Sequence, residues 1–137
     1  MLDDLLADLA RITAAPQAPG FVDRFEEVVE RIAHVDEPES IGGLLRFVDA
    51  RLPDELCFAI VHTVERFPDE TYVPHLLAAL PELYGRAPEW AGILVRRVLN
   101  APGSRAVLTN RRPDLPRDQA RTLHEVMRAL SADHPNG

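Results

Sequence analysis

The sequence contains no lysine, one cysteine and three serines. The single cysteine, Cys57, excludes an intrachain disulfide, and its place in the apolar run LCFAIV predicts a buried, unreactive thiol. None of the serines, which are Ser40, Ser104 and Ser131, lies in the G-x-S-x-G turn of a serine hydrolase. The absence of lysine is most simply explained by genomic base composition. These shortages argue against nucleophilic catalysis.

Metal-binding and phosphate-binding motifs are also missing. The glycine pair Gly42 and Gly43 is not followed by the GK[ST] of a phosphate-binding loop. Acid pairs such as Asp69 and Glu70 could act in acid–base catalysis, but side chains of this kind are usually solvated. Catalysis would then require a site assembled from distant helices. We therefore predict no enzyme, no cofactor and no metal. No pair of histidines has the i, i+4 spacing of a helical zinc site; they are His34, His62, His75, His124 and His134.

Long apolar runs are absent as well. No run approaches the roughly 20 residues of a membrane-spanning helix. The N-terminal stretch MLDDLLADLARITAA begins with acids, where a secretory signal has a basic region. A chain of 137 residues is a typical size for one domain and buries roughly 68% of its unfolded surface without a metal or a disulfide. We expect a single cytoplasmic domain over residues 1–137.

The charge is unevenly spread. Residues 1–90 hold 18 acids and 7 arginines, a net charge of −11, whereas residues 91–137 hold 4 acids and 8 arginines, a net charge of +4. An acidic segment repels nucleic acid and attracts basic proteins, although ordinary solubilising charge is an equally simple explanation. No aromatic residues interleave with the C-terminal arginines, so we predict no direct binding of nucleic acid. We expect these arginines to pair with acids of the first helices, within or between chains.

Apolar residues recur at steps of three and four, which predicts an all-α fold of about seven to eight helices. The stripes run over Leu2–Ile12, Phe21–Ile32, Ile41–Val48, Leu56–Phe67, Leu76–Tyr84, Trp90–Val98 and Ala120–Leu130, with a short helical piece at SRAVLTN. No segment of sufficient length alternates apolar and polar residues as a half-buried strand would. We expect the tail SADHPNG to be frayed.

Several helix ends and packing features follow from particular residues. Ser40 is expected to cap the third helix, and Pro74 to open the fifth. Pro81 then falls inside the fifth helix and should kink or split it. Gly42 and Gly43 either weaken the third helix or allow a neighbouring helix to approach closely.

Two segments resemble each other at an offset of 34 residues. Ile60, Val61, Val64 and Pro68 fall on Leu94, Val95, Val98 and Pro102. This period favours a short α-solenoid of antiparallel helical hairpins, of the HEAT or TPR type. A plain antiparallel helical bundle fits the same pattern.

Between Phe58 and Leu108 the sequence carries, in order, the segments IVHTVERF, DETY, LPELY and EW…LVRRVLN. In this order and spacing they resemble the all-helical immunity proteins of bacterial polymorphic-toxin and contact-dependent growth inhibition systems, in particular immunity protein family thirty. The flanking helices match only by pattern. The ending VRRVLN stands where an isoleucine-leucine-asparagine ending is expected, which is a conservative change.

The resemblance implies a stoichiometric inhibitor in the bacterial cytoplasm that binds the C-terminal toxin domain of a delivered effector. Such toxins are often nucleases with basic clefts, and an acidic inhibitor can imitate the phosphate backbone there. It implies no cofactor, no membrane and no particular oligomeric state. The alternative function is that of a generic helical-repeat adaptor or regulatory module.

The acidic stretch ERFPDET and its neighbours are the candidate toxin-binding residues. Asp69 and Glu70 also suit the positive N-terminal end of a helix, which is a sufficient structural reason for them. Tyrosine is favoured at interfaces because its rigid ring carries a polar tip. The predicted set, with the last three residues expected near the first four, is Glu65, Asp69, Glu70, Tyr72, Glu82, Tyr84 and Glu89.

Overall fold

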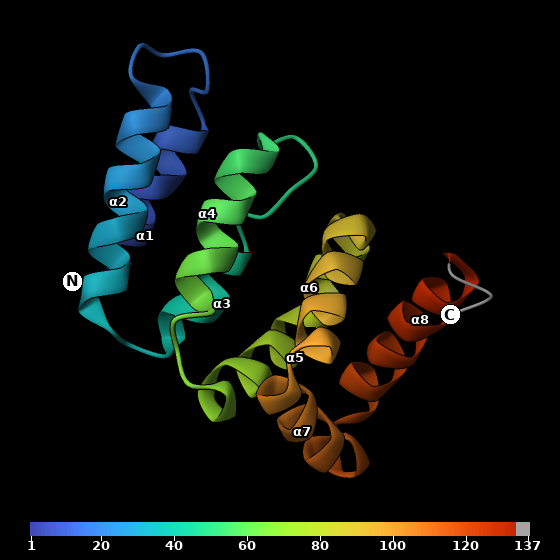
Figure 1. Ribbon diagram of the computed structural model, residues 1–137. Helices are drawn as coiled ribbons and strands as arrows, with labels where there is room; N and C mark the ends of the chain where they lie inside the picture. The colour runs from blue at the N-terminus through green and yellow to red at the C-terminus, as the bar shows by residue number, and fades with distance from the viewer. Residues whose placement is uncertain (134–137) are drawn as a thin grey trace.

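The computed structural model describes residues 1–133, and all regular elements of this part of the chain are helices, as predicted (Figure 1). Its elements are α1 (Leu2–Thr13), α2 (Phe21–Val35), α3 (Glu39–Leu45), α4 (Asp54–Val64), α5 (Asp69–Arg86), α6 (Pro88–Asn100), α7 (Pro102–Arg111), the short 3-10 helix η1 (Arg112–Asp114) and α8 (Arg117–Asp133). Of the tail that was expected to fray, residues 131–133 continue α8, and residues 134–137 lie outside the described part.

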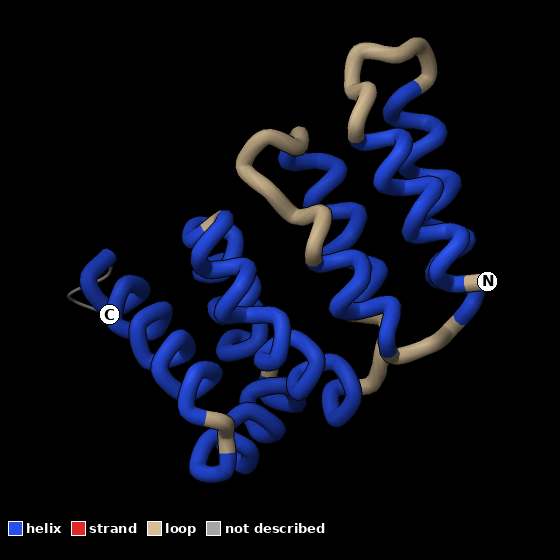
Figure 2. The backbone as a smooth tube through the Cα atoms, turned by 180° about the vertical axis from the view of Figure 1, so that it is seen from behind, coloured by secondary structure: helices blue, strands red, loops and turns tan. Residues whose placement is uncertain are grey.

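The helices form two layers of antiparallel pairs. Figures 1 and 2 show α2, α4 and α6 side by side in one layer and α1, α3 and α5 in the other. Within the layers α2 packs on α4, and α3 packs on α5. Helix α8 closes the C-terminal end by packing against both α5 and α6. The order of stacked hairpins is that expected from the sequence, whereas the assignment to the HEAT type remains a prediction.

The two segments related by 34 residues are α4 and α6, and they are neighbours in the same layer. The rings of Phe58 on α4 and Trp90 on α6 meet edge to face, with their centroids 5.0 Å apart. Trp90 is buried, as its place in an apolar stripe predicts. An aromatic pair of this geometry contributes about 0.5–1.5 kcal/mol beyond the burial of its area.

Arginines also connect successive hairpins. Just after α4, Arg66 places its Nη1 atom 3.5 Å from both carboxylate oxygens of Glu30 on α2. At the end of α5, Arg86 donates from Nη2 to the carbonyl oxygen of Leu45 at 3.0 Å and from Nε to that of Val48 at 3.2 Å. Leu45 is the last residue of α3 and Val48 lies just beyond it, so Arg86 caps the C-terminal end of this helix.

The core is made of the predicted apolar stripes. Cys57 belongs to it, and its Sγ atom lies 3.6 Å from the carbonyl oxygen of Asp49. Cys57 is therefore buried, as predicted, and burial raises the pKa of its thiol. The largest fully buried side chains include Leu9, Phe25, Ile32, Ile41, Leu44, Ile60, Leu76 and Leu80.

Two predicted helix boundaries are wrong. Ser40 does not cap α3, because Pro38 already has helical dihedral angles and the helix starts at Glu39. The Ser40 side chain is 1% exposed, and its hydroxyl has no partner among the described residues. Pro74 does not open α5, which begins at Asp69 and contains Pro74 in its interior.

The physical reason for the early start of α5 is packing. Tyr72 and Val73 are buried on the same side as Leu76, so the apolar face continues N-terminal to Pro74. This burial outweighs the backbone hydrogen bond that Pro74 removes. Pro81 also lies inside the helix, as predicted.

The adjacent glycines of α3 differ in their surroundings. A Cβ atom at Gly43 would lie 2.7 Å from Cδ1 of Leu6, whereas a Cβ at Gly42 would meet nothing within 4 Å. Gly43 therefore lets α1 approach α3 closely, as one of the two sequence hypotheses proposed. Gly42 has no such role.

This difference predicts opposite outcomes for two adjacent substitutions. Gly42→Ala should raise the free energy of unfolding by about 0.5–1 kcal/mol, because alanine favours a helix over glycine. The free energy of unfolding of Gly43→Ala should be lower than that of Gly42→Ala by roughly 1 kcal/mol or more, because the new Cβ atom forces the Leu6 side chain to move. Urea unfolding of the two variants measures the difference, and equal gains would contradict the close approach.

Candidate functional site

The seven predicted binding residues do not line a single pocket. Glu65, Asp69 and Tyr72 come together at one pocket, Glu82 lines a second, and Tyr84 and Glu89 line a third. Glu70 lines none of these three. The expectation that Glu82, Tyr84 and Glu89 lie beside the first four residues is therefore corrected, because the chain carries them to the other end of α5 and to α6.

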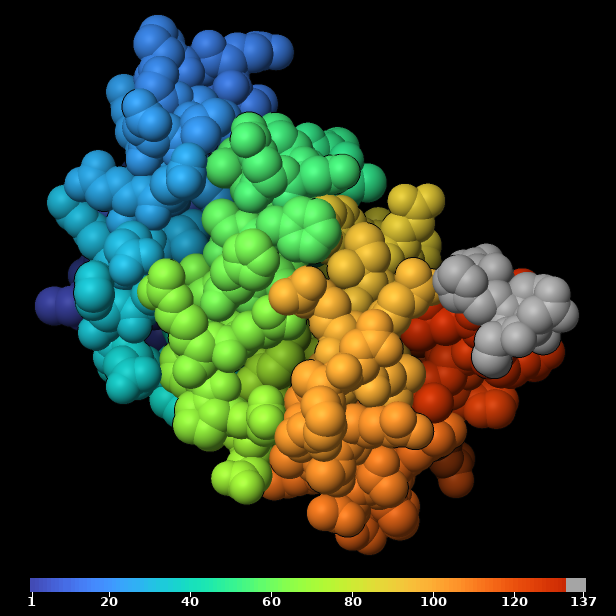
Figure 3. Space-filling model, in the orientation of Figure 1, coloured from blue at the N-terminus to red at the C-terminus, as the bar shows by residue number. Residues whose placement is uncertain are grey.

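The first pocket lies where α4, α5, α6 and α7 meet, and we call it the junction pocket. Its volume is about 410 Å³. In the space-filling view, the green residues that end α4 and start α5 border the orange residues of α6 and α7 (Figure 3). It is lined by Glu65, Asp69, Tyr72, Arg97, Val98, Asn100, Ala101 and Ser104.

One wall of the junction pocket is a two-point ion pair. Arg97 on α6 donates from Nε to Oε2 of Glu65 at 2.8 Å and from Nη2 to Oε1 at 2.7 Å. The hydrogen bond to Glu65 raises the pKa of Arg97. The Glu65 side chain is 27% exposed, so it is held inside the fold and its charge is largely compensated. Arg97, an arginine of the basic C-terminal part, is thus paired with an acid of the acidic part of the same chain.

Tyr72 forms the floor of the junction pocket. It was expected on an exposed rim, but it is 3% exposed, because it belongs to the buried face of α5. Its hydroxyl group has no hydrogen-bond partner among the described residues. Burial raises the pKa of Tyr72 well above its ordinary value; the nearby Glu65 carboxylate adds to this shift and Arg97 opposes it.

Asp69 lies at the edge of the same pocket, in the first turn of α5. Its carboxylate rests against Gly103 in the first turn of α7, where a Cβ atom would collide with it. Helix α7 has no side-chain cap at Ala101, so the carboxylate faces two positive helix ends. Asp69 has no ion-pair partner within the described chain.

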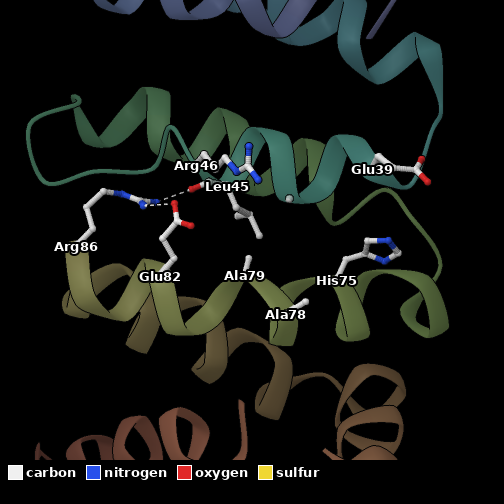
Figure 4. A pocket seen from close by; sticks show the side chains of 9 residues that line it. Glu39, Leu45, Arg46, His75, Ala78, Ala79, Glu82 and Arg86 are labelled. Atoms are coloured by element: carbon white, nitrogen blue, oxygen red, sulfur yellow. Dashed lines mark hydrogen bonds and ion pairs between the residues drawn. The ribbon is translucent and has the colours of Figure 1, made fainter. Parts of the chain in front are cut away.

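The second pocket lies between α3 and α5 and has a volume of about 210 Å³ (Figure 4). Glu82 pairs there with Arg86 at 3.3 Å, the same arginine that caps α3. At the other end, the Nδ1 atom of His75 lies 2.8 Å from the carbonyl oxygen of Thr71. Glu82 and Arg86 are thus paired with each other, whereas Glu39 and Arg46, which also line this pocket, form no ion pair within the described chain.

The third pocket lies between α6 and α8, has a volume of about 420 Å³ and is mainly apolar. Tyr84 is half-buried in it, and Glu89 is exposed at its edge. Gly92 brings α6 close to Leu130 of α8.

The ion pairs of the described residues all lie between Asp8 and Arg97. Apart from the Arg97–Glu65 pair, no arginine of residues 91–133 pairs with an acid of residues 1–90 within the described chain, and pairing between chains stays a prediction. Helix α8 packs on α5 and α6, which places its arginines far from α1 and α2. The arginines of residues 91–133 without an ion pair within the described chain are Arg96, Arg105, Arg111, Arg112, Arg117, Arg121 and Arg128.

Residues 1–133 contain neither a metal-ligand cluster nor a membrane-spanning helix. No group of three or more histidine, cysteine, aspartate or glutamate side chains is placed to hold a metal ion there. Over the same range, no helix has both the length and the apolar character needed to span a membrane.

Comparison with known proteins gives one match. The family model described as Immunity protein 30 matches residues 17–108. This range contains every residue that lines the junction pocket. No curated protein and no solved structure matches the chain.

The unpartnered hydroxyl of Tyr72 generates a prediction about stability and pH. Above about pH 10, the ordinary pKa of tyrosine, the unfolded chain loses the Tyr72 proton while the folded chain keeps it. Stability should therefore fall as the pH rises from there. Tyr72→Phe should remove this loss and, at neutral pH, raise the free energy of unfolding by about 1 kcal/mol, since a buried hydroxyl without a partner is unfavourable. Denaturant unfolding at several pH values measures both effects.

The matched control is Tyr84→Phe, the same substitution at the other tyrosine. The thiol pKa of Cys57 is also raised, so Cys57 lowers the stability of the wild type and of both variants at alkaline pH. The difference between the two variants therefore isolates the effect of Tyr72. A loss of stability in Tyr72→Phe at neutral pH would mean that the hydroxyl has a partner.

Proposed function

Because the chain belongs to the Immunity protein 30 family, we propose that it neutralises a bacterial toxin domain by binding it one to one, without catalysis. The family match carries this proposal, since an immunity protein has a toxin as its partner. We further propose that the complex forms in the cytoplasm of the producing cell. The expected partner is the C-terminal domain of an effector of a contact-dependent or other polymorphic-toxin system.

The charge of the chain supports a nuclease as the toxin. Residues 1–90 carry a net charge of −11, and a nuclease holds phosphates in a basic cleft. Several acids of this part have no ion-pair partner within the described chain and remain free to face such a cleft; they include Asp23, Glu26, Glu55, Glu70 and Glu89. An acidic surface then takes the place of the phosphate backbone.

Charge and burial act on different steps of such an inhibition. Opposite charges speed the encounter of the two proteins, and salt screens this effect. Contacts that become buried in the complex slow its dissociation. Nuclease–immunity pairs are among the tightest complexes known, and their affinity comes from both terms.

The proposal predicts the outcome of a calorimetric titration against the domain encoded directly upstream of this gene. We expect one-to-one binding with a nanomolar Kd that weakens as salt is raised from low to physiological concentration. Binding without salt dependence would keep the immunity function but overturn phosphate imitation. An absence of binding between two folded proteins would overturn the proposed function and favour the helical-repeat adaptor.

A further inference from the structure

We propose that the junction pocket is the anchor site for a basic side chain of the toxin domain, and that this side chain is an arginine. The proposal rests on the proposed function, because it names the place on this chain and the chemistry that hold the toxin.

The charge of the lining favours a cation. Of the three charged residues that line the pocket, Arg97 is occupied by two hydrogen bonds to Glu65. Asp69 is left without an ion-pair partner within the described chain, so the lining has a net charge of −1. One entering cation brings this charge to zero. An entering anion would be repelled by the Asp69 carboxylate, which already occupies the helix ends at the pocket edge.

The floor of the pocket supplies the second observation. Tyr72 is only 3% exposed, and its hydroxyl group has no hydrogen-bond partner among the described residues. Tyr72 lines the pocket together with Glu65 and Arg97, so its unpartnered side chain belongs to the pocket wall. An unsatisfied buried hydroxyl is unfavourable unless a ligand or water completes it.

An arginine fits this arrangement better than a lysine. Its planar fork can give two parallel N–H bonds to the Asp69 carboxylate and still direct another N–H to the oxygen of Tyr72. A lysine ammonium is a compact point charge that does not match a carboxylate in this two-point way. A side chain anchored at the floor of a pocket is also the usual form of an interface residue that contributes most to affinity.

The local backbone is suited to hold the anchor. Gly103 leaves room for the Asp69 carboxylate against the first turn of α7, so the acid is fixed at the pocket edge. The Glu65–Arg97 pair fixes the opposite wall. A preorganised pocket loses little conformational entropy when the ligand enters.

The test compares Asp69→Asn with Glu70→Gln, using the toxin domain encoded upstream as the probe. Both substitutions remove one exposed negative charge from the first turn of α5, but only Asp69 lines the pocket. We expect Asp69→Asn to raise Kd at least tenfold, mainly through faster dissociation. Glu70→Gln should change Kd less than about threefold, mainly through slower association.

Two further variants separate the anchor from a structural role. Tyr72→Phe should weaken binding severalfold while the protein becomes more stable, which a purely structural tyrosine would not do. Gly103→Ala keeps every charge but displaces the Asp69 carboxylate, and it should weaken binding as Asp69→Asn does. Unfolding curves show whether each variant is folded at the temperature of the binding measurement.

A double-mutant cycle then identifies the anchor. Each arginine of the toxin domain is changed to alanine and combined with Asp69→Asn, and one arginine should show a coupling of at least fivefold. If the wild type binds but Asp69→Asn and Glu70→Gln have the same Kd, or no arginine of the toxin domain couples to Asp69, the pocket holds no toxin side chain. That result overturns the anchor assignment and leaves the proposed function standing. If the wild type does not bind, the proposed function fails and the anchor assignment fails with it.

Discussion

Each helical hairpin of this protein has an apolar side that only the next hairpin covers, and this constraint determines the rest of the structure. It is clearest in α4, where Leu56, Ile60 and Val64 are buried together with Cys57 and Val61, so that more than one side of the helix faces protein. The first helix has a single packed side, with only Leu2 and Leu9 buried. Helix α8 ends the series by covering α5 and α6, although it lies beyond the residues matched by the family model.

Helical periodicity was enough to predict the number of helices, the all-α fold and the buried places of Cys57 and Trp90, because each of these depends on one helix face. The errors occur where two elements compete. Ser40 has good capping chemistry, but Pro38 starts the helix earlier. Tyr72 has an interface-like side chain, but the buried face of α5 extends across Pro74 to include it.

The candidate site was predictable only in part, for a related reason. Charge and spacing pointed to Glu65, Asp69 and Tyr72, which do meet in one pocket. They gave no sign that Arg97 lines that pocket or that Gly103 lies against Asp69, because contacts between helices distant in sequence depend on how the hairpins stack. The same stacking sends Glu82 and Glu89 to other pockets.

The arginines that connect the hairpins give the chain a direction. Arg66, Arg86 and Arg97 each reach back to a group of the preceding hairpin: a carboxylate, two helix-end carbonyls and a second carboxylate. A ribosome releases the N-terminal hairpin first, so each hairpin emerges before the arginine that will fasten it. Native order is therefore completed from the amino end towards the carboxyl end during synthesis, and a chain stalled before Arg86 leaves the pair formed by α3 and α4 unfastened on its open side.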